Sequence, residues 1–168
     1  MEIRYRFMKG GEEAQVCALV ERVFREFLAP DYGPEGIHVF FEFANPQSMA
    51  QRAGPEQVIV VAEQGAEIVG MIEMRGCDHI ALLFVSHRRQ GIAKELLRRA
   101  VQECRHREPE VRRITVNSSP FAEPIYRRMG FAATGPVQEK KGILFVPMAC
   151  DCGYEGGVWS TVGRLRSL

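Results

Sequence analysis

The alternation of apolar and polar residues divides this chain into strands and helices. The apolar run Ile80–Val85 is dense enough for a strand that is buried on both faces. After a break over 86–91, apolar residues return with helical spacing from Ile92 to Cys104, and charged residues occupy the opposite face. The pattern therefore predicts a buried strand, a short loop containing a glycine, and an amphipathic helix.

The same reading predicts the other elements, in the order β-α-α-β-β-β-α-β-α-β-β. Strands are expected over 3–8, 58–63, 68–74, 80–85, 114–117, 132–137 and 143–149. Helices are expected over 12–28, 35–43, 92–105 and 121–129, with one more helical turn over 48–53 that Ser48 caps. This order predicts an α/β (α+β) fold, a mixed sheet with helices packed on it.

Length and composition narrow the class of protein. A chain of 168 residues has the length of a single domain. Its net charge of +1 gives no electrostatic reason to expect nucleic acid or an anionic membrane surface as a partner. No apolar run approaches a membrane span, and the charged start lacks a secretory core, so we expect a cytoplasmic protein. Five irregularly spaced cysteines predict neither a disulfide framework nor a metal site.

The end of the chain differs from the rest. Residues 1–149 carry all of the predicted elements, and 150–168 show no clear period. We therefore expect one domain over 1–149, followed by a mobile appendage over 150–168.

The loop between the buried strand and its helix has the features of an anion site. The first amides of a helix have no internal partner and lie at the positive end of the helix dipole. Gly91 lets a ligand approach the backbone, and Arg88 and Arg89 add positive charge. These features predict a phosphate or pyrophosphate site. The P-loop and Gly-x-Gly-x-x-Gly motifs are both missing, which disfavours an unrelated nucleotide-binding domain.

Two short motifs resemble those of a known family. The segment RRQGIA (88–93) matches Arg/Gln-x-x-Gly-x-Gly/Ala, the acyl-CoA pyrophosphate motif of the GNAT superfamily of N-acetyltransferases. A strand ending in Asn117, followed by a helix that carries YRRMGF (126–131), resembles the second half of that family. The resemblance covers residues 1–149 and implies a mixed, mostly antiparallel central sheet flanked by helices.

The resemblance also implies where acetyl-CoA binds. It would lie where the central strand and the strand over 114–117 splay apart, with its pyrophosphate on the loop and its arm along the strand end. The implied cofactor-binding residues are Phe84, Val85, Arg88, Arg89, Gln90, Gly91, Ile92, Ala93, Lys94 and Asn117. From the sequence alone, Asn117 could instead cap the following turn.

The resemblance makes Tyr126 the acid that protonates the departing thiolate, although a tyrosine that only packs remains the alternative. The base is left open between Glu73 and His79, and either could instead be a solvated residue at a strand end. The segment that shapes the acceptor pocket in the family here contains Glu26, Asp31, Tyr32, Phe40 and Phe41, of which the last two fit the core better than the pocket.

The implied function is the acetyl-CoA-dependent N-acetylation of a primary amine on a small molecule or peptide. The alternative is an acyl-CoA-binding or regulatory module of the same fold with little or no turnover. Two features favour that alternative: the connection over 86–90 is shorter than is usual in the family, and no base is evident. No metal is implied, and the exposed strands leave a homodimer open.

Overall fold

A computed structural model describes residues 2–152 of the chain. The strands are β1 Ile3–Phe7, β2 Val58–Gln64, β3 Glu67–Arg75, β4 His79–Val85, β5 Arg113–Ser118, β6 Ala132–Ala133, β7 Gln138–Lys140 and β8 Ile143–Asp151. The helices are α1 Glu13–Phe27, the 3-10 turn η1 Ala29–Asp31, α2 Pro34–Phe43, α3 Pro46–Arg52, α4 Ile92–Arg107 and α5 Glu123–Arg128.

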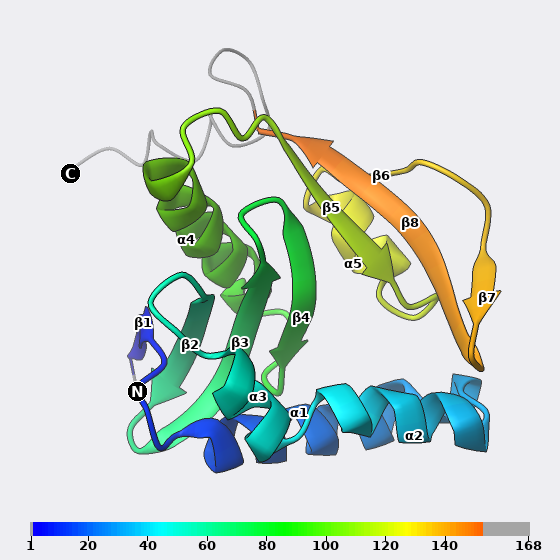
Figure 1. Ribbon diagram of the computed structural model, residues 1–168, viewed down its shortest axis with the longest axis horizontal. Coiled ribbons are helices and arrows are strands. Elements are labelled where there is room, and N and C mark those ends of the chain that lie inside the picture. The colour runs from blue at the N-terminus through cyan, green and yellow to red at the C-terminus, as the bar shows by residue number, and fades with distance from the viewer. Residues whose placement is uncertain (1, 153–168) are drawn as a thin grey trace.

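The strands form one mixed sheet in the order β1-β2-β3-β4-β5-β8-β6, with β7 paired to β8 (Figure 1). Every pairing is antiparallel except that between β4 and β5. The parallel pair is joined by a crossover through α4, as such pairs require. The predicted fold class, a mixed and mostly antiparallel sheet flanked by helices, is confirmed.

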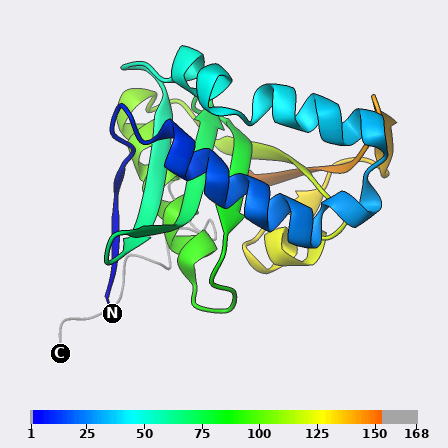
Figure 2. The same ribbon diagram turned by 90° about the horizontal axis from the view of Figure 1, so that it is seen from below.

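Helices cover both faces of the sheet (Figures 1 and 2). On one face, the apolar sides of α4 and α5 pack on the sheet in one cluster of buried residues. On the other face, α1, α2 and α3 enclose a second cluster that is rich in phenylalanine. Gly70 on β3 lets α4 come close, because a Cβ there would lie 3.0 Å from side-chain carbons of Ile92 and Leu96. The first turn of α4 is thereby held against the sheet beside the end of β4.

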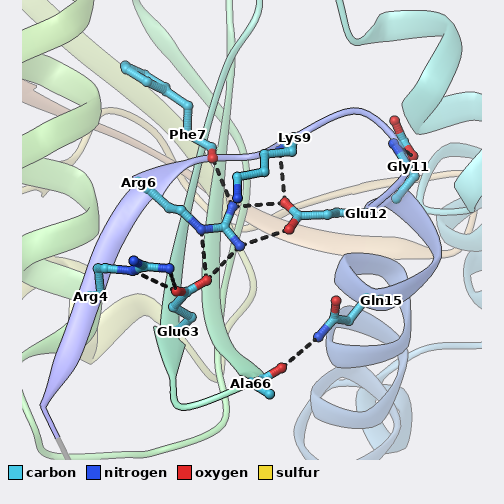
Figure 3. A network of polar contacts seen from close by, with 10 residues as sticks. Arg4, Arg6, Phe7, Lys9, Gly11, Glu12, Gln15, Glu63 and Ala66 are labelled. Atoms are coloured by element: carbon cyan, nitrogen blue, oxygen red, sulfur yellow. Dashed lines mark hydrogen bonds and ion pairs between the residues drawn. The ribbon is translucent and has the colours of Figure 1, made fainter.

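The N-terminal edge is held by an ionic network, which Figure 3 shows. Arg6 on β1 binds both Glu63 on β2 and Glu12, the residue before α1, and Arg4 also binds Glu63. The Nη2 of Arg6 lies 2.8 Å from a Glu12 oxygen and 2.6 Å from a Glu63 oxygen. The network therefore joins β1 to its neighbour and to the start of the first helix.

Several predicted boundaries need correction. Helix α3 is capped by Asn45 rather than by Ser48: the Asn45 side chain accepts a 2.9 Å hydrogen bond from the Ser48 amide. Helix α5 begins at Glu123, later than expected. The single strand expected over 132–137 is interrupted where Gly135 and Pro136 stand, and only β6 and β7 on either side pair with β8.

The predicted domain boundary also moves. Strand β8 continues past residue 149 to Asp151, and the side chain of Cys152 is fully buried. The Cys152 amide also donates to the Arg112 carbonyl, at 2.8 Å. The domain therefore extends at least to residue 152, and the rest of the expected appendage lies outside the described residues.

Candidate active site

The two edges of β4 differ sharply. Along β3, it pairs over six residue pairs, from Arg75–His79 to Gly70–Val85. Along β5, it pairs over only two, His79–Thr115 and Ile80–Val116. The register with β3 shifts directly after Ile80, and such a bulge bends a strand. Beyond this point β4 and β5 diverge (Figure 1), which leaves one edge of β4 without a partner strand.

The backbone of β4 presents alternate residues to the two sides. The Ser86 amide donates to the Val69 carbonyl at 2.9 Å, so Ser86 and Phe84 face β3. Because neighbouring residues of a strand face opposite ways, the backbone amides of Leu83 and Val85 point to the unpaired side. The expectation for Phe84 therefore needs correction: its main chain is committed to β3, and Leu83 takes its place.

A cavity of about 570 Å³ occupies the place where the strands diverge. Its walls come from β4, the loop after it, the first turn of α4, the end of β5 and helix α5. The predicted residues that line it are Phe84, Val85, Arg88, Arg89, Gly91, Ile92, Ala93, Lys94, Asn117 and Tyr126. Of the predicted cofactor-binding set, Gln90 alone is missing from this lining. The predicted residues thus make up part of the cavity wall.

The loop before α4 has an unusual backbone. Arg89 (φ 62°) and Gly91 (φ 73°) both adopt left-handed conformations, and Gly91 is the N-cap of α4. Turns of this kind direct successive amides into one concave surface. No side chain caps the helix, so its first amides remain available. A Cβ at Gly91 would meet no atom within 4 Å, so the space beside this backbone is open.

Arg88 lines the cavity and lies close to two aromatic rings. Its guanidinium lies 4.9 Å from the ring centre of Phe27, at the end of α1, and 5.4 Å from that of Phe121, before α5. The two rings are themselves stacked, with their centres 5.2 Å apart. Such cation–π contacts hold a guanidinium in place without neutralising its charge. Arg88 thus joins the two sides of the opening and keeps a positive charge there.

Two polar side chains from the C-terminal half reach the cavity. Tyr126 is only 6% exposed, and its ring packs edge-on against Phe131. Within residues 2–152, its hydroxyl has no hydrogen-bond partner, and burial raises the pKa of Tyr126. Asn117 lies on the exposed side of β5 and also lines the cavity. A buried hydroxyl without a partner is costly, which indicates that a ligand group completes it.

The two candidate bases lie elsewhere. Glu73 does not line the cavity: it is fully buried, and Arg52 binds its two oxygens at 2.8 and 3.1 Å. Gln57 donates a further bond to it at 2.9 Å. Both readings of Glu73, as a base or as a solvated residue, therefore need correction. A carboxylate held in this way ties α3 to β3.

His79 stands at the closed end of the divergence. It belongs to one of the two residue pairs that join β4 to β5, and its Nδ1 lies 2.8 Å from the Thr115 hydroxyl. Burial, followed by the positive charge of Arg75, lowers the pKa of its imidazole. His79 is not among the lining residues, so the structure places it outside the cavity as well.

The sequence reading missed part of the apolar wall. Phe27, Phe121 and Ile143 line the cavity, as does Phe40, which was expected to belong to the core rather than to the pocket. Tyr32 from the same predicted acceptor segment is also present, whereas Glu26, Asp31 and Phe41 are not. A signal was available for Phe121, because it directly follows the strand end and turn that the second motif marks.

A second hollow, of about 960 Å³, lies between β1 and α4. Several arginines line it, but their charges are already paired. Arg98 and Arg99 bind Glu95 at 2.7 Å, and Arg6 belongs to the network of Figure 3. The cavity beside β4 is therefore the better candidate site, since no side chain caps α4 there and the Tyr126 hydroxyl has no partner within residues 2–152.

Comparison with known protein families identifies the family of this chain. A family model described as an acetyltransferase (GNAT) domain matches residues 28–152. The chain belongs to the GNAT acetyltransferase family. The matched region contains β4, the loop, α4, β5 and α5, which all contribute to the cavity wall. Among curated proteins, no sequence gave a significant match.

Solved structures of other GNAT acetyltransferases share the fold. A GCN5-related N-acetyltransferase from Rhodopseudomonas palustris is 19% identical, with a TM-score of 0.75 over 89% of this chain and 95% of that one. A GNAT-family acetyltransferase from Staphylococcus aureus is 14% identical, with a TM-score of 0.71 over 90% of this chain and 100% of that one. The PaiA N-acetyltransferase from Thermoplasma acidophilum was solved in complex with coenzyme A. It is 15% identical, with a TM-score of 0.68 over 88% of this chain and 98% of that one.

Residues 2–152 contain no group of three or more side chains suited to holding a metal ion. None of their helices combines the length and the apolar character that crossing a membrane requires.

Proposed function

We propose that this GNAT protein transfers an acetyl group from acetyl-CoA to a primary amine. The observation that carries the proposal is the unpaired edge of β4, which opens into a cavity between the amides of α4 and the hydroxyl of Tyr126. Each of these groups lacks a partner in the described chain and suits a different part of acetyl-CoA.

The residues fit the cosubstrate in three places. Left-handed Arg89 and Gly91 open the backbone toward the first amides of α4, where a pyrophosphate would be stabilised. The amides of Leu83 and Val85 offer strand-like hydrogen bonds to the amides of the pantetheine arm. Asn117 stands on the opposite wall and can bind the same arm. The neighbour that was solved with coenzyme A has the same fold, which supports this placement.

The chemistry follows from the same groups. A β4 amide that points into the cavity can donate to the thioester carbonyl oxygen as negative charge develops there. The uncharged amine forms a bond to the carbonyl carbon, the carbon–sulfur bond breaks, and Tyr126 donates its proton to the departing sulfur. The nitrogen releases its extra proton to solvent, and Tyr126 regains a proton from solvent. Because burial raises its pKa, Tyr126 is protonated at neutral pH, as an acid must be. No covalent bond to the protein is required.

One observation favours the second candidate function, an acyl-CoA-binding module with little turnover. Glu73 and His79, the two residues considered as bases, are both absent from the cavity lining. Under this alternative, acetyl-CoA binds but no amine is acetylated. The two functions therefore differ in turnover rather than in binding.

The direct test is calorimetric titration of the protein with acetyl-CoA, with ATP and NAD as controls, followed by a search for acetylated amines by mass spectrometry. Saturable binding of acetyl-CoA alone is the expected result, together with release of CoA in the presence of an acceptor. Binding without any acetylated product would favour the module. Equal binding of ATP or NAD would contradict both functions.

A further inference from the structure

Helix α2 and the turn between β7 and β8 meet backbone to backbone at two glycines. Gly36, in the first turn of α2, is the one buried residue of this helix. A Cβ added to Gly36 would lie 2.7 Å from the Gly142 carbonyl carbon, and a Cβ added to Gly142 would lie 2.8 Å from the Gly36 nitrogen. Both views show the start of α2 beside this turn (Figures 1 and 2). Only glycines allow two elements to come so close.

This contact lies at the wall of the cavity beside β4. Ile143 directly follows Gly142 and lines the cavity, and its Cγ1 would lie 3.4 Å from a Cβ on Gly36. Phe40 stands four residues after Gly36, so the two share a face of α2, and Phe40 also lines the cavity. The contact between Gly36 and Gly142 therefore joins α2 to the start of β8 where both elements bound the cavity.

The joined walls stand on the side from which an acceptor has to come. Helix α4, whose first amides suit the pyrophosphate, packs with α5 on one face of the sheet. Helices α1 and α2 cover the opposite face. CoA bound as proposed occupies the approach beside α4, so an amine reaches a thioester between β4 and β5 from the side of α1 and α2. On that side, α2 and the β7–β8 hairpin bound the entrance.

We propose that the contact between Gly36 and Gly142 blocks one end of this entrance and restricts the acceptor to a small-molecule amine. This rests on the proposed acetyl transfer. A lysine within a polypeptide has chain on both sides of it, so it needs a groove that continues past the site in two directions. The backbone contact removes one of these directions. A free amine carries no flanking chain and fits a pocket that is closed at one end.

The contact can be opened without disturbing the centre of the sheet. Within residues 2–152, β7 pairs only with β8, and its three residues are exposed. Gly36→Ala puts a methyl group against the Gly142 backbone and does not weaken α2, because alanine is the better helix former. The hairpin therefore has to move away. Gly33→Ala is the matched control, because a Cβ three residues earlier would meet no atom within 4 Å.

Trypsin reports on the contact without any acceptor. Lys140 and Lys141 directly precede Gly142, so cleavage after them depends on how firmly this turn is held against α2. We expect Gly36→Ala to be cleaved there several times faster than wild type, and Gly33→Ala at the wild-type rate. Acetyl-CoA affinity, measured by calorimetry, should equal that of wild type in both variants, which also shows that both are folded.

The acceptor test offers primary amines free and within a chain, with saturating acetyl-CoA and detection by mass spectrometry. One library contains small amines, among them putrescine, benzylamine and Nα-acetyl-lysine. The other contains short peptides with a blocked N-terminus and one central lysine. We expect kcat/KM for the best free amine to exceed that for the best peptide by about tenfold or more. Gly36→Ala should reduce this ratio, and Gly33→Ala should leave it unchanged.

The outcomes separate this proposal from the proposed function. If acetyl-CoA does not bind, or binds while neither library is acetylated, the acetyl transfer itself is overturned. If acetyl-CoA binds and peptides are acetylated as fast as free amines, only the small-molecule acceptor is overturned. Equal cleavage by trypsin and equal selectivity in Gly36→Ala and Gly33→Ala would overturn the role of the contact.

Discussion

The two sides of β4 serve different purposes. On the β3 side, the backbone groups are paired in a long ladder of hydrogen bonds. The buried carboxylate of Glu73 is paired there with Arg52. On the β5 side, the ladder stops after two residue pairs, and strand amides, helix amides and the Tyr126 hydroxyl are left without partners. The site therefore lies where the fold leaves hydrogen-bonding groups without partners. Burial of a polar residue alone does not identify it.

The largest expected effect concerns the paired side. Arg52→Met removes the cation that binds Glu73 and leaves a carboxylate with no exposed surface next to Gln57 alone. We expect the free energy of unfolding to fall by about 3–5 kcal/mol. Denaturant unfolding measures it. The affinity of the folded protein for acetyl-CoA should not change.

The control is another arginine in an ion pair that is exposed to solvent. Arg22 pairs with Glu67 at 3.3 Å, and more than half of each side chain is accessible. Arg22→Met should therefore cost less than about 1 kcal/mol. Equal losses from the two variants would show that the Glu73 pair is not an important support of the fold.

The next effect concerns the open side. Tyr126→Phe removes only the hydroxyl that faces the cavity, so the transfer rate should fall about 100-fold while stability and acetyl-CoA affinity stay close to wild type. Steady-state kinetics and calorimetry measure the two quantities. Tyr5→Phe is the control, because Tyr5 lies beside Arg99, outside this cavity. An unchanged transfer rate in Tyr126→Phe would remove its role as the acid.

A smaller effect is expected in the loop. Gly91→Ala forces a left-handed conformation on alanine and adds a methyl group where the space is open for a pyrophosphate. Stability should fall by about 1 kcal/mol, and acetyl-CoA should bind about tenfold more weakly. Gly76→Ala has similar strain (φ 60°) in the turn between β3 and β4, so it should lose stability only. Equal affinities in the two variants would argue against the loop as the pyrophosphate site.

The smallest effect lies at the far edge of the sheet. A hydrogen bond between Glu12 and Arg6 lowers the pKa of the Glu12 carboxyl from 4.5 to about 2. A lowered pKa stabilises the folded state above pH 4.5, and this contribution is lost as the pH falls from 4.5 toward 2. Glu12→Gln should therefore lower Tm at pH 7 and flatten its decline between pH 5 and about 2. An unchanged Tm profile would contradict this role of the network in Figure 3.

The sequence predicted those parts of the site that depend on local pattern. The buried strand, the loop and α4 are contiguous, so apolar spacing and one glycine located them. The motif around Tyr126 and Asn117 placed both on the cavity wall. The interruption of the expected strand at Gly135 and Pro136 was missed, although both residue types disfavour the interior of a strand.

The errors concern residues whose role depends on distant partners. Alternation along β3 does not reveal that Arg52, from a helix 21 residues earlier, binds Glu73. The sequence also does not reveal that His79 and Ile80, the first two residues of β4, are the ones that pair with β5. Phe84 and Val85 were both expected at the gap, although neighbouring residues of a strand face opposite ways. The hydrogen bond from the Ser86 amide to the Val69 carbonyl on β3 decides that Leu83 and Val85 face the gap.

The most direct test of the central claim is amide hydrogen exchange along β4, followed by NMR with and without acetyl-CoA. The account predicts that the Phe84 amide is protected in both states by its pairing with β3. The Leu83 and Val85 amides should exchange quickly in the free protein and slow markedly when acetyl-CoA is added. Fast exchange of Leu83 and Val85 that saturating acetyl-CoA leaves unchanged would contradict the account.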